Sequence, residues 1–180
     1  MIGEDIYIID DVIPLSKQTE IEDLFTHSRI PWIFNRDISL TQQEIKKLGI
    51  KKLTPGIGTP IKDYQSKYVN SEILDKIKII PEQACVGITK VCDTIYQARA
   101  FIHFPLIPEL KREYDNIHID LAFEHLVVLY YVNDTDGDTF IFDKKNDYEN
   151  INLASVENQN ELNIIKRISP KKGRALVFNG

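Results

Sequence analysis

Short apolar segments separated by turn-forming residues dominate the second half of the chain, and this pattern constrains the fold most. Branched and aromatic side chains fill each segment, and clusters of Asn, Asp, Gly and Pro divide them. Residues 133–138, with their run of Asp around Gly137, are such a turn cluster. We therefore predict strands at 94–104, 118–121, 126–133, 139–142, 162–168 and 174–178, as in a jelly roll or open barrel.

The first half of the chain carries more helical patterns. A strand is expected at 5–13, ended by Pro14, and an extended piece begins at 31–34. Ser16 looks like the N-cap of a helix that reaches about residue 28, with Ile21, Leu24 and Phe25 as its apolar stripe. Further helices are predicted at 71–79 and 82–91, and residues 40–60, rich in Pro and Gly, are predicted to form a surface excursion.

These elements predict one α+β domain, mainly β in its core. A length of 180 residues suits a single domain. We expect residues 1–92 to form an α-rich N-terminal support and residues 93–180 to form the β core. The helices would pack outside the sheet.

Composition and charge exclude several classes of function. A net charge of −5 disfavours broad nucleic-acid binding, which needs Lys and Arg to neutralise phosphates. No apolar stretch approaches the roughly 20 residues of a membrane helix, and the first residues lack the features of a secretory signal. Cys85 and Cys92 fit neither a disulfide framework nor a CxxC pair. We expect a cytoplasmic protein with two buried free thiols.

The sharpest chemical feature is His118-Ile119-Asp120. On a strand, residues i and i+2 project from one face, about 7 Å apart at their Cα atoms. An imidazole and a carboxylate placed in this way form half of a site for a divalent metal, and a second His would complete a 2-His-1-carboxylate triad. HxD also arises by chance, as a surface His beside a turn-capping Asp.

The motifs that follow add context. An apolar strand ends in Tyr130-Tyr131-x-Asn133-Asp134, G-x-T-x-x-F follows at 137–142, and P-x-x-G-x-x-x-x-F follows at 170–178. Together with HxD, in this order, they resemble the prolyl-hydroxylase-like branch of the 2-oxoglutarate/Fe(II)-dependent dioxygenases, in particular its small members from marine bacteria and phages. The resemblance covers residues 94–180; the first ninety residues match only in having helices before the core.

The resemblance implies a double-stranded β-helix with iron at one mouth. It places His118 and Asp120 as metal ligands and Tyr130 as a contact of the 2-oxoglutarate C5 carboxylate, although Tyr130 could instead be a core tyrosine. Arg99 and His103 share a face of the strand before HxD by alternation, so both are candidate cosubstrate contacts. The alternatives are a salt bridge for Arg99 and an ordinary strand histidine for His103.

The chain departs from the family pattern at its end. In the family a distal His and a basic residue that clamps 2-oxoglutarate come after the last motif, whereas this sequence ends at Gly180. We therefore expect an incomplete domain that lacks its C-terminal strands and is inactive as a 180-residue chain. Among other histidines, His125 follows HxD too closely, His27 belongs to the predicted N-terminal helix, and His103 is the best internal substitute.

The activity implied by the resemblance is hydroxylation of a prolyl or other peptidyl side chain, or of a small molecule, with release of succinate and CO₂. Its cofactors would be Fe(II) and 2-oxoglutarate, with ascorbate as a further candidate. The rival hypotheses are a non-catalytic β-helix binding module and a metal-dependent hydrolase or isomerase of cupin type. No P-loop, GxGxxG or GxSxG motif supports another chemistry. We expect a small-molecule or peptide substrate and no membrane partner, and the sequence does not specify an oligomeric state.

Overall fold

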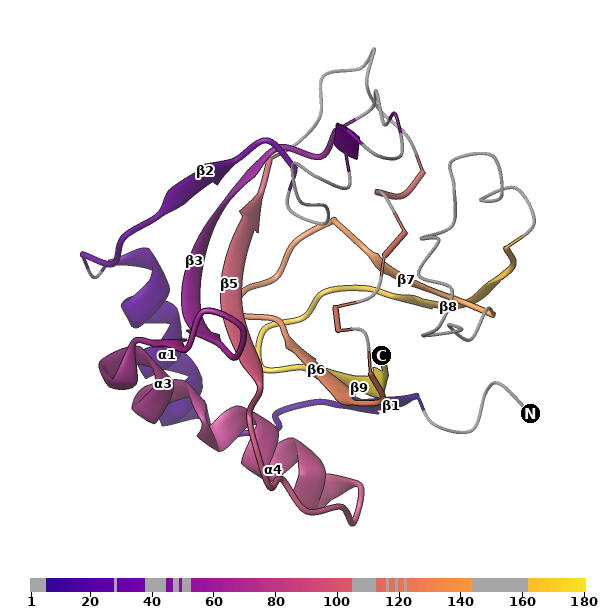
Figure 1. Ribbon diagram of the computed structural model, residues 1–180. Coiled ribbons are helices and arrows are strands. Elements are labelled where there is room, and N and C mark those ends of the chain that lie inside the picture. The colour runs from indigo at the N-terminus through magenta and orange to yellow at the C-terminus, as the bar shows by residue number, and fades with distance from the viewer. Residues whose placement is uncertain are drawn as a thin grey trace.

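The protein has an α+β fold with mostly antiparallel sheets and few helices (Figure 1). Every strand pairing among the described residues is antiparallel. The computed structural model describes residues 6–27, 29–37, 45–46, 49, 53–104, 113–115, 117–118, 120–121, 123–143 and 162–180.

The first sheet, sheet A, joins segments from the two ends of the sequence. Its strands lie in the order β1 (Tyr7–Ile9), β9 (Ala175–Asn179) and β6 (Leu126–Tyr130). Val177 of β9 is the register partner of Tyr7 on one side and of Val128 on the other. The central strand β9 is the most buried, because Ala175, Leu176 and Val177 are fully inaccessible to solvent.

The second sheet, sheet B, is built around β3 (Gly56–Asp63), which pairs with β2 (Ile33–Asn35), β4 (Tyr68–Val69) and β5 (Gln97–His103). The prediction of a surface excursion at 40–60 is therefore wrong for residues 56–60, which begin the central strand; 38–44, 47–48 and 50–52 lie outside the described residues. Glycine is required at Gly58, because a Cβ there would lie 2.6 Å from the ring of Phe101 on β5.

A third, two-stranded sheet consists of β7 (Thr139–Phe142) and β8 (Ile164–Ile168). Thr139 pairs with Ile168, and the register shifts between Ile141 and Phe142. These strands, together with β5, β6 and β9, confirm five of the predicted strand positions, although most are shorter than predicted. The strand predicted at 118–121 is wrong for the described residues 118, 120 and 121, which lie outside any strand.

Three helices cover the sheets: α1 (Leu15–Thr26), α3 (Ser71–Ile77) and α4 (Ile79–Gly87). α1 begins one residue before Ser16, so the predicted N-cap lies inside the first turn and no side chain caps this helix. Asn70 caps α3, since its Oδ1 accepts a hydrogen bond from the Ile73 amide at 3.2 Å. Pro81 lies in the first turn of α4, where its missing amide hydrogen costs nothing.

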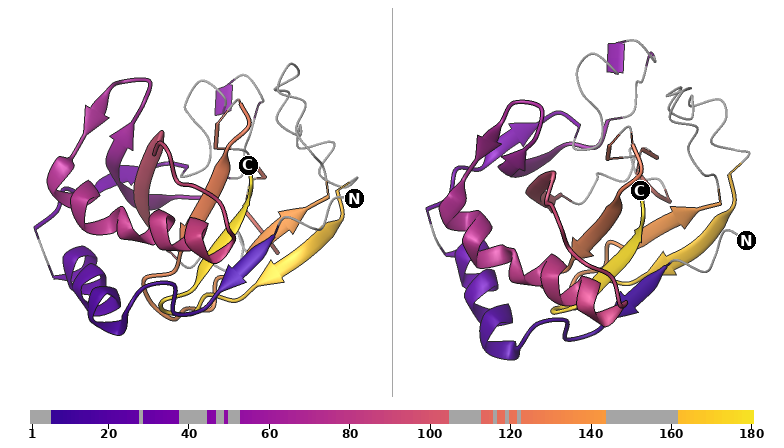
Figure 2. Two further views of the ribbon diagram at one scale, coloured as in Figure 1. Left: turned by 90° about the horizontal axis from the view of Figure 1, so that it is seen from below. Right: turned by 60° about the horizontal axis from the view of Figure 1, so that its bottom comes forward.

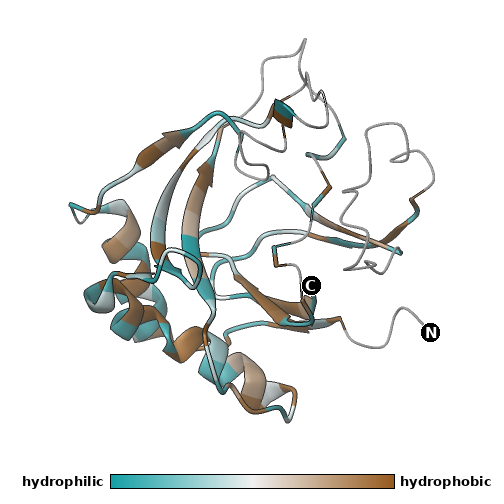
Figure 3. Ribbon diagram, in the orientation of Figure 1, coloured by the Kyte–Doolittle hydropathy of each residue, from teal (hydrophilic) through white to brown (hydrophobic). Residues whose placement is uncertain are grey.

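The helices pack on one face of sheet A and on one face of sheet B (Figure 2). Ile21 of α1 and Ala84 of α4 contact the face of sheet A that carries Val177, and Leu24 and Ile73 contact the face of sheet B that carries Ala98 and Ala100. The other face of sheet A packs against β7 and β8 through Tyr131, Leu176 and Ile168. Figure 3 shows the hydrophobic residues of β6 and β9, which contribute to both sides of sheet A.

Sheets A and B each contain strands from both sides of residue 92, the predicted boundary between the N-terminal support and the β core. β1 pairs with β9, and β3 pairs with β5, so the first half supplies strands as well as supporting helices. The sequence predicted the strand at 5–13 and the extended piece at 31–34 but missed β3, because pairing partners far apart in the chain leave no local pattern. Within the part of the chain that the structure describes, no helix has the length and apolar character to cross a membrane.

Candidate functional site

The candidate site lies on the face of β5 that points away from the helices. Ala98 and Ala100 pack into the helix-covered cluster, so the alternate residues Arg99, Phe101 and His103 project from the opposite face. The guanidinium of Arg99 lies over the ring of Phe101, 5.2 Å from its centroid. The shared face predicted for Arg99 and His103 is therefore present.

Arg99 and Asp120 meet at this face. The Nη2 atom of Arg99 donates a hydrogen bond to Oδ1 of Asp120, and each side chain keeps about 30% of its surface exposed. Asp120, the carboxylate of the HxD motif, is thus brought next to a cation rather than left in solvent. The salt bridge considered for Arg99 is present, and it involves the predicted metal ligand itself.

His118 lies two residues before Asp120 and is exposed. Because Asp120 lies in a bend and neither residue belongs to a strand, the i, i+2 rule for strands does not fix their relative orientation. The two groups are close in sequence, and Asp120 contacts β5 through Arg99.

A second pair forms at the end of β5. The Nδ1 atom of His103 lies 3.7 Å from Oδ2 of Asp115. Asp115 also accepts a hydrogen bond from the Thr54 hydroxyl at 3.1 Å. Sequence reasoning missed Asp115, because nothing near it in the chain distinguishes it from other surface carboxylates.

Aromatic contacts attach the segment after Asp120 to sheet B. The ring of Phe123 lies 5.7 Å from Tyr64, 5.2 Å from Tyr96 and 5.9 Å from His125, measured between centroids. The carbonyl oxygen of Phe123 is 2.6 Å from Nδ1 of His125. These ring contacts, rather than the predicted strand, hold the segment that contains Asp120 near β5. The periodicity of the sequence could not predict an aromatic cluster of this kind.

The structure separates Tyr130 from this site. Tyr130 lies on the helix-covered face of sheet A, and its hydroxyl has no hydrogen-bond partner among the described residues. Burial raises its pKa to about 12, with contributions from the carboxylates of Glu22 and Asp11. The core tyrosine considered as an alternative for Tyr130 describes this environment.

Its neighbour Tyr131 projects from the opposite face of sheet A. The hydroxyl of Tyr131 donates to the Thr139 hydroxyl at 2.7 Å, and burial raises its pKa. Because the helices cover the other faces of both sheets, Tyr131 and Arg99 each lie on the side of their sheet away from the helices.

The donor chemistry suits iron at two positions. His118 and Asp120 offer the imidazole nitrogen and carboxylate oxygen that Fe(II) accepts. No group of three or more His, Cys, Asp or Glu side chains that could hold a metal ion occurs among the residues whose positions are described. His27 lies at the end of α1, where its Nδ1 is 3.3 Å from Oδ1 of Asp23, so it belongs to a different part of the molecule.

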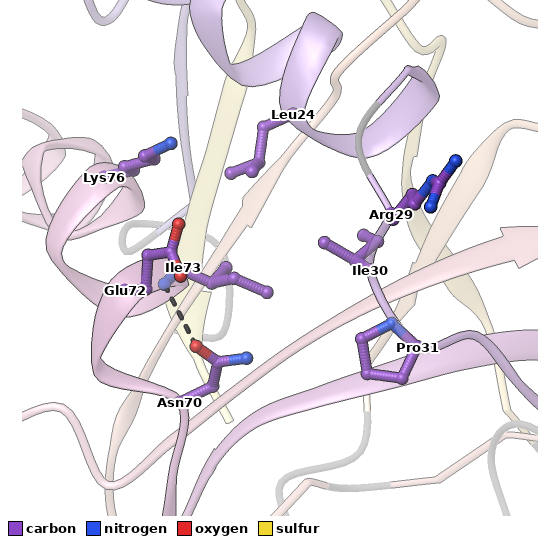
Figure 4. A pocket seen from close by; sticks show the side chains of 8 residues that line it. All are labelled: Leu24, Arg29, Ile30, Pro31, Asn70, Glu72, Ile73 and Lys76. Carbon is purple, nitrogen blue, oxygen red and sulfur yellow. Dashed lines mark hydrogen bonds between the residues drawn. The ribbon is translucent and has the colours of Figure 1, made fainter.

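A pocket of about 220 Å³ lies elsewhere, between the end of α1, residues 29–31 and the start of α3 (Figure 4). Leu24, Ile30 and Ile73 form its apolar wall. Figure 4 shows Arg29 and Lys76 on different sides of the pocket, so their charges do not converge on one point. This pocket shares no residue with the Arg99–Asp120 site.

Comparison with known proteins identifies no relative. No protein-family model, no curated protein and no solved structure matches the chain. The functional conclusion therefore depends on the motifs and on the arrangement of their side chains.

Proposed function

We propose that the protein is an Fe(II)- and 2-oxoglutarate-dependent oxygenase that hydroxylates a prolyl or other peptidyl side chain, or a small molecule. One observation carries the proposal: Asp120 of the HxD motif contacts Arg99, on the β5 face that also bears His103. A metal ligand and two candidate cosubstrate contacts thus belong to one face of sheet B.

The fold that we propose for this activity is a double-stranded β-helix. Antiparallel pairing throughout the described strands supports it, as does the packing of sheet A against the β7–β8 pair on the side away from the helices. The order of the HxD, Tyr-Tyr, G-x-T-x-x-F and P-x-x-G motifs is the sequence basis for the same conclusion.

In this proposal His118 and Asp120 hold the metal, and a third ligand completes the triad. The family pattern places that ligand after the strand corresponding to β9. Bound iron and 2-oxoglutarate would supply the oxidation of an unactivated C–H bond, with release of succinate and CO₂. The chain's own contribution is to orient these groups and to exclude water from them.

Arg99 has two roles in this scheme. Its guanidinium pairs with Oδ1 of the Asp120 carboxylate, and it would have to release this oxygen for Asp120 to hold a metal through Oδ1. Once released, a guanidinium beside the metal is suited to bind a carboxylate of the cosubstrate through two parallel hydrogen bonds. His103 is the second candidate contact, and Asp115 can orient its imidazole.

We assign the cosubstrate contact to a different tyrosine from the one that the resemblance implies. The resemblance assigned the C5-carboxylate contact to Tyr130, whose hydroxyl lies on the helix-covered face of sheet A. Tyr131 projects from the other face, so its position favours Tyr131 for this role. The reason is geometric, since Tyr130 at the end of β6 packs on the helix side of sheet A and Tyr131, which follows it, packs on the β7–β8 side.

The Arg99–Asp120 pair also favours a second candidate function. A guanidinium that permanently occupies the motif carboxylate would be typical of a domain that kept the fold and lost its metal. Such a protein would be a non-catalytic binding module. The two candidates differ in whether Asp120 releases Arg99 when metal is added.

Succinate formation tests the proposal. The protein, expressed from its complete reading frame, would be incubated aerobically with Fe(II), ascorbate and isotopically labelled 2-oxoglutarate. We expect iron-dependent labelled succinate that is absent when Zn(II) replaces Fe(II). Metal binding without succinate would instead support a hydrolase or isomerase of cupin type, and absence of both would support the binding module.

A further inference from the structure

The pocket of Figure 4 opens where the hydrogen-bonded ladder at one edge of sheet B is interrupted. β5 pairs with β3 along one edge, so β2 and β4 share the other edge and pair with the start and the end of β3. Continuing the β2 register would place Pro31 opposite Pro60, and neither proline has an amide hydrogen to donate. The ladder therefore stops between β2 and β4, and residues 29–31 and Asn70, which flank this gap, line the pocket.

The pocket has an apolar floor and a charged rim. Leu24 of α1 and Ile73 of α3 are only 6% and 3% exposed, and Figure 4 shows Ile30 pointing toward Ile73. Arg29 and Lys76 are exposed at the rim. A ligand suited to such a pocket is amphipathic, with an apolar body and a charged end.

The charges at the rim favour an anion at Arg29. Glu72 and Lys76 lie four residues apart on α3, so their opposite charges are neighbours on one side of the helix and largely compensate each other. Arg29, on the other side of the pocket, forms no ion pair with the residues that the structure describes. A guanidinium binds a carboxylate through two parallel hydrogen bonds, so a carboxylate is the charged end that suits this side of the pocket.

We propose that this pocket binds a free aliphatic monocarboxylate of about six to eight carbon atoms. The volume of about 220 Å³ sets this length, since an apolar cavity of roughly 150 Å³ holds one benzene molecule. The carboxylate pairs with Arg29, and the aliphatic chain packs on Leu24, Ile30 and Ile73.

This site is independent of the proposed oxygenase function. The pocket shares no residue with the Arg99–Asp120 site. Neither cysteine lines it: Cys85 is buried, as the sequence predicted, whereas Cys92, also predicted to be buried, is only partly buried. Loss of carboxylate binding would therefore leave iron-dependent succinate formation unchanged, and the two proposals can fail separately.

Titration with hexanoate tests the proposal. Trp32, the only tryptophan of the chain, directly follows Pro31 of the pocket, so its fluorescence reports on binding. We expect saturable binding with a dissociation constant on the order of 1 mM, as suits a ligand of about eight non-hydrogen atoms. Hexanol, which lacks the charge, should bind about tenfold more weakly, and succinate, which lacks the apolar end, should not saturate.

Two arginine variants locate the carboxylate. Arg29→Gln keeps a polar side chain and removes the charge, so its affinity for hexanoate should fall about tenfold, to the level of hexanol. Arg36→Gln, at an exposed arginine that does not line the pocket, is the matched control and should bind like the wild-type protein. Thermal unfolding checks that both variants are folded.

A third variant tests the apolar floor. Ile30→Ala shortens one wall of the pocket, so hexanoate and hexanol should lose affinity by the same factor, roughly threefold to fivefold. Unchanged binding of both ligands would place them outside the pocket.

The proposal would be overturned by equal affinities for hexanoate and hexanol, by wild-type affinity in Arg29→Gln, or by absence of saturation at hexanoate concentrations well above the expected constant. Tighter binding of N-acetylleucine than of hexanoate would also overturn it, because the natural ligand would then be the carboxyl-terminal residue of a peptide rather than a free acid.

Discussion

The guanidinium of Arg99 on β5 donates a hydrogen bond to the carboxylate of Asp120, the second polar residue of the HxD motif. The two residues come from segments that the sequence predicted separately, and the contact joins the candidate metal ligand to the candidate cosubstrate strand. Phe101 supports the guanidinium from the same face. Most of the functional predictions follow from this contact.

Replacing either HxD residue should remove metal binding. In Asp120→Ala or His118→Ala we expect iron-dependent succinate formation to fall to background and the dissociation constant for Co(II) to rise at least about tenfold. Isothermal titration with Co(II) measures the second effect independently of turnover. Asp136→Asn, in the exposed β6–β7 turn, is the matched control and should retain both properties. Unchanged metal affinity in Asp120→Ala would exclude Asp120 as a ligand.

Replacing Arg99 should increase the affinity for metal and decrease the affinity for 2-oxoglutarate. In Arg99→Gln the Asp120 carboxylate loses its competing cation, so we expect Co(II) to bind roughly fivefold more tightly, corresponding to about 1 kcal/mol for a partly exposed ion pair. The KM for 2-oxoglutarate should rise, because the bidentate contact is lost. Arg29→Gln, which lines the remote pocket, should change neither value. Weaker metal binding in Arg99→Gln would contradict the competition.

The two adjacent tyrosines should differ in their effect on stability. In Tyr130→Phe the free energy of unfolding should stay the same or increase, because the removed hydroxyl has no described partner. In Tyr131→Phe it should fall by about 1 kcal/mol, because the bond to Thr139 is lost. Urea denaturation measures both. If Tyr131 contacts the cosubstrate as proposed, only Tyr131→Phe raises the KM for 2-oxoglutarate.

An ion-pair cluster predicts a pH dependence of stability. Hydrogen bonds from Arg174, at 2.6 Å, and Lys171, at 2.9 Å, hold the pKa of Asp10 well below its usual range. Since the folded-state pKa is lowered, the stabilisation is present above the unfolded value near 4 and is lost as the pH falls below it. Discounted for solvent screening, we expect Asp10→Asn to cost about 1 kcal/mol at pH 7 and less at pH 3.

Urea denaturation of the Asp10→Asn variant at both pH values measures this effect. Asp75→Asn is the control, because Asp75 forms a local i, i+3 ion pair with Lys78. An Asp10→Asn cost that grows as the pH falls would contradict the sign derived from the lowered pKa.

Gly58→Ala should disturb the site through sheet B. The added Cβ would lie 2.6 Å from the ring of Phe101, so Phe101 or the strand must shift, at a cost of about 1–3 kcal/mol. The KM for 2-oxoglutarate should also rise, because the ring of Phe101 supports the guanidinium of Arg99. Thermal unfolding and the succinate assay measure these effects. Gly137→Ala, where no atom lies within 4 Å of the added carbon, is the matched control.

Local patterns predicted the elements whose structure is decided locally. β7 was predicted at its observed bounds because an apolar run lies between a turn cluster and a polar stretch. α3 was also predicted from residue 71, although it ends at Ile77 rather than at the predicted residue 79. The common face of Arg99 and His103 followed from the two-residue period of a strand.

Contacts between residues that are far apart in the sequence explain the wrong predictions. β3 was read as a loop because Gly56, Gly58 and Pro60 are rare in strands, yet Gly58 is there to admit Phe101 from β5. The strand expected around HxD is replaced by ring contacts of Phe123 with Tyr64 and Tyr96, which come from other parts of the chain. Asp115 was missed for the same reason, since its partner His103 is distant in sequence.

The position of β9 between β1 and β6 has a consequence for biosynthesis. β1 is translated more than 160 residues before β9, the strand that must lie beside it. During that interval the apolar side chains of Tyr7, Ile9 and Val128 lack their principal neighbour, so chaperones have time to bind the nascent polypeptide. Sheet A can close only as a late event, at a rate limited by the joining of distant segments.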